Sequence, residues 1–178
     1  MTTVHRTNLA LLFPSALGWM ATVWNGPLLS QITFGYKTHD SVAAAIGDAI
    51  ETVNVQANMT KLATQNELVS RLQTFAEGGV DDFLDIEIAD QSLTKFQRQV
   101  VRCCRKIPYG QTVTYSQLAS QTGSPRAARA VGSVMAANRF PLVVPCHRVV
   151  GANGRLGGFS APDGVRMKQH LLNLERAS

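Results

Sequence analysis

Cysteines and long hydrophobic runs are scarce in this sequence. Its 178 residues include three cysteines, Cys103, Cys104 and Cys146, and no CxxC spacing. This excludes a disulfide-rich scaffold and indicates a reducing, intracellular compartment, cytoplasmic or, in a eukaryote, nuclear. The apolar stretch at residues 9–12 soon meets Pro14, and no charged-then-apolar signal segment precedes it. The sequence therefore predicts a soluble protein with no membrane span.

Charged residues are also few, at 16%, whereas hydrophobic residues make up 45%. That balance excludes a largely disordered chain. The length suits one domain, or one domain with a small added module, and is sufficient to bury a core without a metal or a disulfide.

The charge is divided unevenly along the chain. Residues 1–90 hold four basic and ten acidic side chains, a net charge of −6, whereas residues 91–178 hold thirteen basic and two acidic ones, a net charge of +11. The basic residues are scattered, which is typical of a folded surface and not of a disordered tail. This half is predicted to bind a polyanion, most simply nucleic acid.

The first half, residues 1–90, is predicted to be a small α/β structural module that begins with a β-hairpin. Residues 17–24 and 28–33 are predicted to form its two strands, because the segment Asn25-Gly26-Pro27 between them has the composition of a tight turn.

Two helices and a third strand are expected after the hairpin. Ser41 is expected to cap a helix over residues 42–51, and a second helix over residues 65–76 is expected to end before Gly78. Residues 81–88 end in alternating apolar and acidic side chains, which predicts a half-exposed strand.

The second half, residues 91–178, is predicted to be mainly helical, so the fold class is α/β of the α+β type. The boundary is expected at residues 89–93, and a helix is expected from Thr94 to just before Pro108. The remaining features form a helix-turn-helix pattern: helices over residues 115–121 and 125–137, a turn at 122–124, Ser124 as N-cap and Pro125 at the first helical position.

The second helix of this pattern carries small side chains and arginines, among them Arg126 and Arg129. Small residues favour a close approach to a backbone or a narrow groove. Taken alone, however, the segment favours a tightly packed helix whose arginines are solvated.

Cys146 and His147 lie side by side after the apolar run at residues 140–145, which two prolines interrupt. A cysteine attacks as the thiolate, so a neighbouring base or cation such as His147 or Arg148 favours a nucleophile. On these residues alone, a small buried hydrophobic residue remains the alternative.

Several separate motifs occur together in one order: Tyr115-Ser-Gln-Leu-Ala, Arg126-Ala-Ala-Arg-Ala-Val-Gly, Asn138, Pro145-Cys-His-Arg-Val, Gly157-Gly-Phe-Ser and Leu171-Leu-Asn-Leu-Glu175. From residue 94 to 175 the chain resembles the O6-alkylguanine-DNA alkyltransferases, also called methylated-DNA–protein-cysteine methyltransferases. The first half resembles them only loosely. The resemblance implies irreversible, stoichiometric transfer of an alkyl group from guanine O6 in DNA to Cys146, and it leaves open whether O4-alkylthymine is a substrate.

The resemblance also implies the catalytic roles. Glu175 would orient His147, and His147 would withdraw the thiol proton of Cys146 through a water, as in a hydrolase triad. Tyr115 would donate to the guanine ring as negative charge develops there, although by itself it also fits an aromatic core residue.

The remaining site residues follow from the same resemblance. The helix-turn-helix would bind the minor groove and rotate the target nucleotide out of the stack, with Arg129 in its place. The expected DNA-binding residues are Arg129, Arg126, Ala127, Ala128, Ala130, Gly132 and Arg148. The expected substrate pocket comprises Met135, Asn138, Val149, Gly157, Gly158, Phe159 and Ser160. Asn138 would also act as a hinge that bonds the backbone near Cys146.

The sequence departs from the family pattern at Arg139, where proline is common, at Phe159, where others have tyrosine, and at residues 161–163, which replace a glycine pair. None of these removes a catalytic group. Residues 1–90 contain no cysteine and only His5 and His39 as histidines, so no zinc site is expected. No other cofactor is expected. The expected partner is double-stranded DNA containing O6-alkylguanine, bound by a monomer.

Two alternative functions remain. A non-catalytic sensor would bind damaged DNA with the same helix-turn-helix, but such proteins lack the cysteine. A cysteine hydrolase or acyltransferase would use Cys146 and His147 over many turnovers, but it leaves Arg129 and the basic half unexplained.

Overall fold

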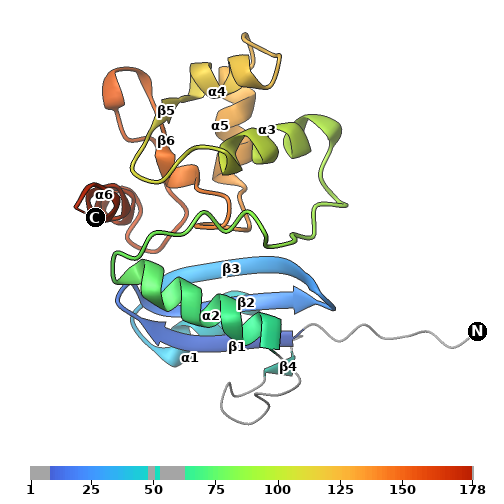
Figure 1. Ribbon diagram of the computed structural model, residues 1–178, viewed down its shortest axis with the longest axis vertical. Helices are drawn as coiled ribbons and strands as arrows, with labels where there is room; N and C mark the ends of the chain where they lie inside the picture. Colours follow the sequence, from blue (N-terminus) through green and yellow to red (C-terminus); the bar gives the residue numbers. More distant parts are fainter. Residues whose placement is uncertain (1–8, 48–50, 53–62, 178) are drawn as a thin grey trace, which may run out of the picture.

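The computed structural model describes residues 9–47, 51–52 and 63–177. Figure 1 shows a sheet with flanking helices from the first half and a group of helices from the second half above it. The strands are β1 (Leu9–Ser15), β2 (Gly18–Asn25), β3 (Leu28–Tyr36), β4 (Glu51–Thr52), β5 (Val113–Thr114) and β6 (Val149–Val150). The helices are α1 (His39–Ile46), α2 (Ala63–Ala76), α3 (Lys95–Arg105), α4 (Tyr115–Gln121), α5 (Ala128–Ala136) and α6 (Val165–Arg176), with short 3₁₀ turns η2 (Cys146–Arg148) and η3 (Ala152–Gly154).

The predicted hairpin is confirmed, because β2 and β3 pair antiparallel from Trp19 opposite Tyr36 to Asn25 opposite Leu28. Gly26 takes a positive φ of 60° in the connecting turn, a conformation that favours glycine. The sequence did not predict β1 as a strand, yet it pairs antiparallel with β2 along its whole length. The sheet order is β3-β2-β1-β4, so β3 is an edge strand.

Both faces of this sheet are covered. Along β1, Leu11 and Phe13 belong to the large hydrophobic cluster that includes α2, whereas Ala10 and Leu12 pack in a smaller cluster with α1. The alternation follows from the two-residue period of a strand. The first half is therefore a three-layer α/β/α arrangement, with α2 crossing one face in Figure 1.

Two predicted ends in the first half need correction. Helix α1 begins after Thr38, whose hydroxyl accepts from the backbone N–H of Ser41, so Ser41 lies inside the helix and completes a capping box. The predicted extension to residue 51 is wrong, because α1 ends at Gly47 with φ 83° and residue 51 belongs to β4. Helix α2 is confirmed, and it ends before Gly78 as predicted.

The predicted strand over residues 81–88 is also wrong. Asp81 and Asp85 both bind Arg71 of α2 at 2.7 Å, and Phe83 between them takes a positive φ of 50°. These acidic side chains therefore form ion pairs with Arg71, and the segment is not a strand of the sheet. Only Ile88 forms a single parallel bridge, to Leu29 at the sheet edge.

In the second half, α3 and α4 lie where predicted, capped by Thr94 and Thr114. The second helix of the helix-turn-helix starts later than predicted, since α5 begins at Ala128 and its N-cap is Ala127. Ser124 instead accepts a hydrogen bond from Ala127 through its backbone carbonyl, in a turn that contains Pro125. The predicted cap at Ser124 and helical start at Pro125 are therefore wrong.

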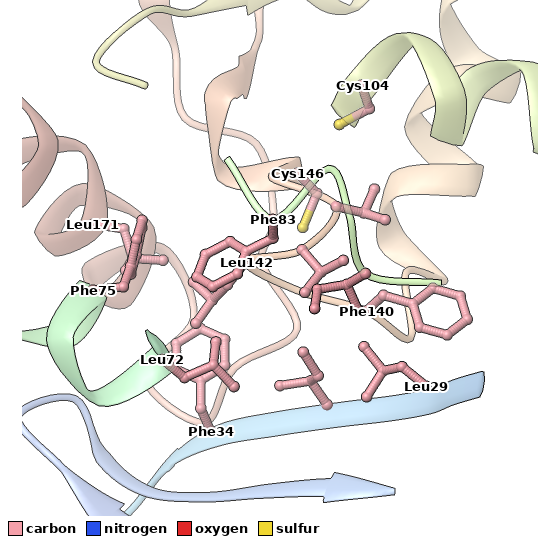
Figure 2. Packing of buried hydrophobic residues seen from close by; sticks show 14 of the residues in the cluster. Leu29, Phe34, Leu72, Phe75, Phe83, Cys104, Phe140, Leu142, Cys146 and Leu171 are labelled. Carbon is pink, nitrogen blue, oxygen red and sulfur yellow. The ribbon is translucent and has the colours of Figure 1, made fainter. Parts of the chain in front are cut away.

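One hydrophobic cluster joins the two halves. Figure 2 shows Leu29 and Phe34 of β3 beneath Phe140 and Leu142, near Cys146. The backbone continues this contact, because the N–H of Ile32 donates to the carbonyl of Arg139 at 2.8 Å. The edge strand β3 thus supports the segment that carries Cys146. None of the helices in the described part of the chain is long and apolar enough to cross a membrane.

Candidate active site

Cys146 lies at the start of the short turn η2, between the 140–145 segment and strand β6. Its backbone N–H donates to the carbonyl of Val144 at 2.7 Å. The preceding segment bends through Leu142, which takes a positive φ of 73° although it is not glycine. The bend holds Cys146 at 6% exposure, next to a pocket.

The side chain of Asn138 fixes this segment by three hydrogen bonds. Its Nδ2 donates to the carbonyl of Val144 at 2.9 Å and to Sγ of Cys146 at 3.1 Å, and its Oδ1 accepts from the N–H of Phe140 at 3.0 Å. This is the bonding to backbone expected of Asn138. The contact with the sulfur is an additional feature that also supplies a donor to a thiolate.

A fully buried cluster centres on the carboxylate of Glu175. Its Oε1 lies 2.7 Å from Nε2 of His147, and its Oε2 accepts from the N–H of Gly110 at 2.9 Å. Nδ1 of His147 has no hydrogen-bond partner within the described residues. The geometry therefore favours the tautomer with the proton on Nε2, which leaves the Nδ1 lone pair available as a base.

Arg148 belongs to this cluster and not to the surface. Its guanidinium donates to both Glu175 oxygens at 2.8–3.0 Å and to the carbonyl of Ile107 at 2.8 Å, and it stacks on the ring of Tyr109. The side chain of Arg148 is 2% exposed. The expectation that Arg148 contacts DNA is therefore corrected, because a buried guanidinium does not reach a phosphate.

Burial and pairing act in opposite directions on the two acid–base groups. Burial alone would raise the pKa of Glu175, but hydrogen bonds from His147 and Arg148 lower that pKa to about 2. Burial lowers the pKa of His147, and the contact with Glu175 offsets this only in part. Glu175 is thus charged and His147 neutral near pH 7.

The thiol of Cys146 is influenced by a lysine that the sequence interpretation missed. Burial raises the pKa of Cys146, while the donor from Asn138 and the charge of Lys168 partly oppose that rise. Lys168 is 1% exposed and donates to the carbonyl of Val149 at 2.7 Å. Lys168 lies three residues before Leu171 and seven before Glu175, so all three share the buried face of helix α6. This spacing is the sequence signal that could have identified Lys168.

Tyr115 and the glycine loop lie together beside this group. A Cβ added to Gly157 would come within 2.8 Å of the Tyr115 hydroxyl, and one added to Gly132 would come within 4.0 Å of the ring. Lys168 Nζ lies 5.8 Å from the ring centroid. Burial raises the pKa of Tyr115, so the phenol keeps its proton and remains a donor.

A cavity of about 230 Å³ opens on Cys146. Of the expected pocket residues, Asn138, Phe159 and Ser160 line it, and the Ser160 hydroxyl donates to the carbonyl of Ala136. The other expected pocket residues do not line this cavity; they are Met135, which is buried in the core, Val149, Gly157 and Gly158. The sequence did not indicate that β3 contributes a wall, which residues 31–34 form.

The expected DNA-binding residues of the helix-turn-helix differ in their exposure to solvent. Arg126, Arg129 and Ala130 are exposed, whereas Ala127 and Gly132 are half-buried. Ala128 is half-buried and packs against the core. The exposed face of α5 therefore combines Arg129 with small side chains, and the exposed Arg126 lies in the turn before it.

No group of three or more histidine, cysteine or acidic residues within residues 9–47, 51–52 and 63–177 could hold a metal ion. His5 lies outside the described residues. Cys104 is buried in the hydrophobic core, and Cys103 packs against that core.

Comparison with known proteins identifies the same segment. The family model described as the DNA binding domain of 6-O-methylguanine DNA methyltransferase matches residues 95–177. Two proteins named methylated-DNA–protein-cysteine methyltransferase are 40% identical over 109 residues in Methanosarcina acetivorans and 46% identical over 108 residues in Mycolicibacterium paratuberculosis. The alignments cover 61% of this chain in both cases, and 67% and 63% of the relatives, so the chain spans about two thirds of their length.

The likeness to solved structures includes the first half as well. The crystal structure of Mycobacterium tuberculosis OGT in complex with DNA matches with a TM-score of 0.74 and 29% identity, over 95% of this chain and 93% of that one. The shared motifs and the shared fold lead to one conclusion. The chain belongs to the family of O6-methylguanine DNA methyltransferases, the methylated-DNA–protein-cysteine methyltransferases.

Proposed function

We propose that the protein repairs DNA directly, by transferring the alkyl group of O6-alkylguanine to Cys146 in a single irreversible turnover. The observation that carries the proposal is the buried pair of His147 and Glu175, in which His147 follows Cys146 directly in the chain, while Asn138 donates to the Cys146 sulfur. Family membership makes DNA the expected partner. The exposed Arg129 of α5 and Arg126 in the preceding turn provide charge for binding it.

The direction of the hydrogen bond between His147 and Glu175 indicates how the thiol of Cys146 is activated. His147 is neutral and its Nε2–H donates to Glu175, so Nδ1 is the base that takes the thiol proton, through a bridging water as the family resemblance implies. Glu175 then stabilises the imidazolium that forms. Asn138 donates to the sulfur and supports its negative charge.

Transfer requires one bond to form and one to break. The sulfur of Cys146 attacks the alkyl carbon in line with the C–O6 bond, and the electron pair of that bond passes to the guanine. Tyr115, kept protonated by burial, donates to the base as this charge develops. The family resemblance implies that the backbone carbonyls of Cys146 and Val149 accept from the exocyclic amine; the Val149 carbonyl, which already accepts from Lys168, has a second lone pair for this.

Access to the lesion requires base flipping, because duplex DNA hides guanine O6 from a thiol that is 6% exposed. Arg129 on the exposed face of α5 fills the space left in the stack. Its small neighbours allow a close approach to the minor groove, where sequence is poorly distinguished. A repair protein benefits from that indifference to sequence.

The test is intact mass spectrometry after incubation with a duplex oligonucleotide that contains one O6-methylguanine. We expect one added methyl group per protein, located on Cys146 by peptide mapping, and no further turnover with excess DNA. Cys146→Ala should lose the adduct and keep DNA binding. DNA binding without an adduct would favour a sensor, and repeated turnover would favour a hydrolase or acyltransferase.

A further inference from the structure

The pocket beside Cys146 contains a cation that the proposed function does not use. Arg139 lines this cavity of about 230 Å³ together with residues 31–34 of β3 and the Phe159–Ala161 segment. The cavity is larger than a methyl group needs, since a water molecule takes about 30 Å³ in the liquid. Its volume alone does not restrict the substituent to methyl.

The backbone of Arg139 is fixed on both sides. Its carbonyl accepts from the N–H of Ile32 in β3 at 2.8 Å. The preceding residue, Asn138, contacts both the backbone and the sulfur of Cys146. The long side chain of Arg139 therefore starts from a defined position close to the reacting sulfur.

The guanidinium of Arg139 remains available. The side chain is exposed, and within residues 9–47, 51–52 and 63–177 it makes neither a hydrogen bond nor an ion pair. Gln31, Thr33 and Ser160 also line the cavity and carry amide or hydroxyl groups, and no acidic side chain lines it. The apolar part of the lining consists of Ile32, Phe34, Pro141, Phe159 and Ala161. Because Arg139 is the charged residue of this lining, the cavity favours an anionic ligand.

Resting on the proposed function, we propose that this pocket holds the substituent of the lesion and that Arg139 adapts it to substituents that end in a carboxylate, such as carboxymethyl. In that transfer the Cys146 sulfur bonds to the methylene carbon, and the bond from that carbon to O6 breaks. The electron pair of the broken bond passes to guanine, which then takes up a proton, while the thiol proton goes to His147. The products are S-carboxymethylcysteine and unmodified guanine.

A carboxylate next to the reacting carbon repels the attacking thiolate, so such lesions react slowly in a site without a compensating cation. Arg139 supplies that charge from the pocket rim. Because its side chain is exposed, water weakens the attraction, and we expect roughly a fivefold effect on rate. The effect should also weaken as salt is added.

The experiment compares rates of adduct formation on full-length protein by intact mass, with single-stranded oligonucleotides that contain O6-methylguanine or O6-carboxymethylguanine. Arg139→Gln should lower the ratio of carboxymethyl to methyl transfer about fivefold, and Arg139→Lys should restore part of it. Arg155→Gln removes an exposed arginine that does not line the cavity and should leave the ratio unchanged. Added salt should lower the ratio in the wild type and have little effect in Arg139→Gln.

Other results separate the two proposals. An unchanged ratio in Arg139→Gln, or equal losses on both substrates, would overturn the role of Arg139 and leave alkyl transfer standing. Wild-type protein that reacts with the methyl lesion but not with the carboxymethyl lesion would also overturn the role of Arg139 and leave alkyl transfer standing. Protein that reacts with neither would overturn the proposed function itself.

Discussion

Replacing Arg148 with methionine removes one of the two side chains that pair with a buried carboxylate, that of Glu175. The guanidinium makes three contacts with Glu175 at 2.8–3.0 Å and one with the carbonyl of Ile107, and both charged side chains are at most 3% exposed. Methionine fills much of the same space without charge. Glu175 is then left with only His147 and the N–H of Gly110.

Breaking a buried pair in this way typically costs about 3–5 kcal/mol of the free energy of unfolding. The lowering of the Glu175 pKa from 4.5 to about 2 corresponds to about 3 kcal/mol, which His147 and Arg148 share, so the part lost with Arg148 is smaller than that total. A carboxyl whose pKa is lowered by folding stabilises the fold above its ordinary pKa of 4.5, and this stabilisation is lost as the pH falls toward 2. In Arg148→Met the pKa of Glu175 rises, so less stabilisation remains to be lost in that range.

Urea unfolding of the wild type and Arg148→Met between pH 7 and pH 3 measures both effects. Arg166→Met is the matched control, because Arg166 is 89% exposed and lies 3.8 Å from Asp163; we expect a change within about 0.5 kcal/mol. A loss below about 1 kcal/mol for Arg148→Met, or an acid dependence identical to that of the wild type, would show that the Arg148–Glu175 pair does not stabilise the fold.

Three further predictions concern transfer and DNA binding. Gly157→Ala places a methyl group 2.8 Å from the Tyr115 hydroxyl, so transfer should slow at least about tenfold in single-turnover assays, and an unchanged rate would contradict the role of the phenol. Asn138→Ala removes the donor to the sulfur, so the pKa of Cys146 should rise in a thiol-reactivity titration; a constant or lower value would contradict the assignment. Arg129→Ala should slow repair of duplex DNA more than repair of single strands, whereas equal losses would exclude insertion into the stack.

Much of the fold follows from local signals in the sequence. The hairpin of β2 and β3 has a short turn with a glycine at positive φ, and α3 and α4 have threonine caps, so their own residues specify them. Strand β1 was missed because a proline near its end and an uninterrupted apolar run obscured the alternation. Only its neighbours β2 and β4 reveal it as a strand.

The failures arose where distant residues decide the structure. Asp81 and Asp85 alternate like strand residues, but their partner Arg71 lies ten or more positions away. Motif resemblance suggested Cys146, His147 and Glu175, and the structure joins His147 to Glu175 across 28 residues, next to Cys146 in the chain. The same resemblance put Arg148 at the DNA surface. The neighbouring sequence does not distinguish an exposed arginine from one whose guanidinium binds a buried carboxylate.

The position of β3 at the edge of the sheet has a consequence for solubility. An unpaired strand edge can add strands from other chains and start aggregation. Here the backbone of Leu29 is paired with residues 87 and 89, and the N–H of Ile32 with Arg139, so segments outside the sheet occupy part of that edge. The opposite edge strand, β4, is only two residues long. A first half produced without the rest of the chain would expose part of the β3 edge, and it should self-associate where the intact protein does not.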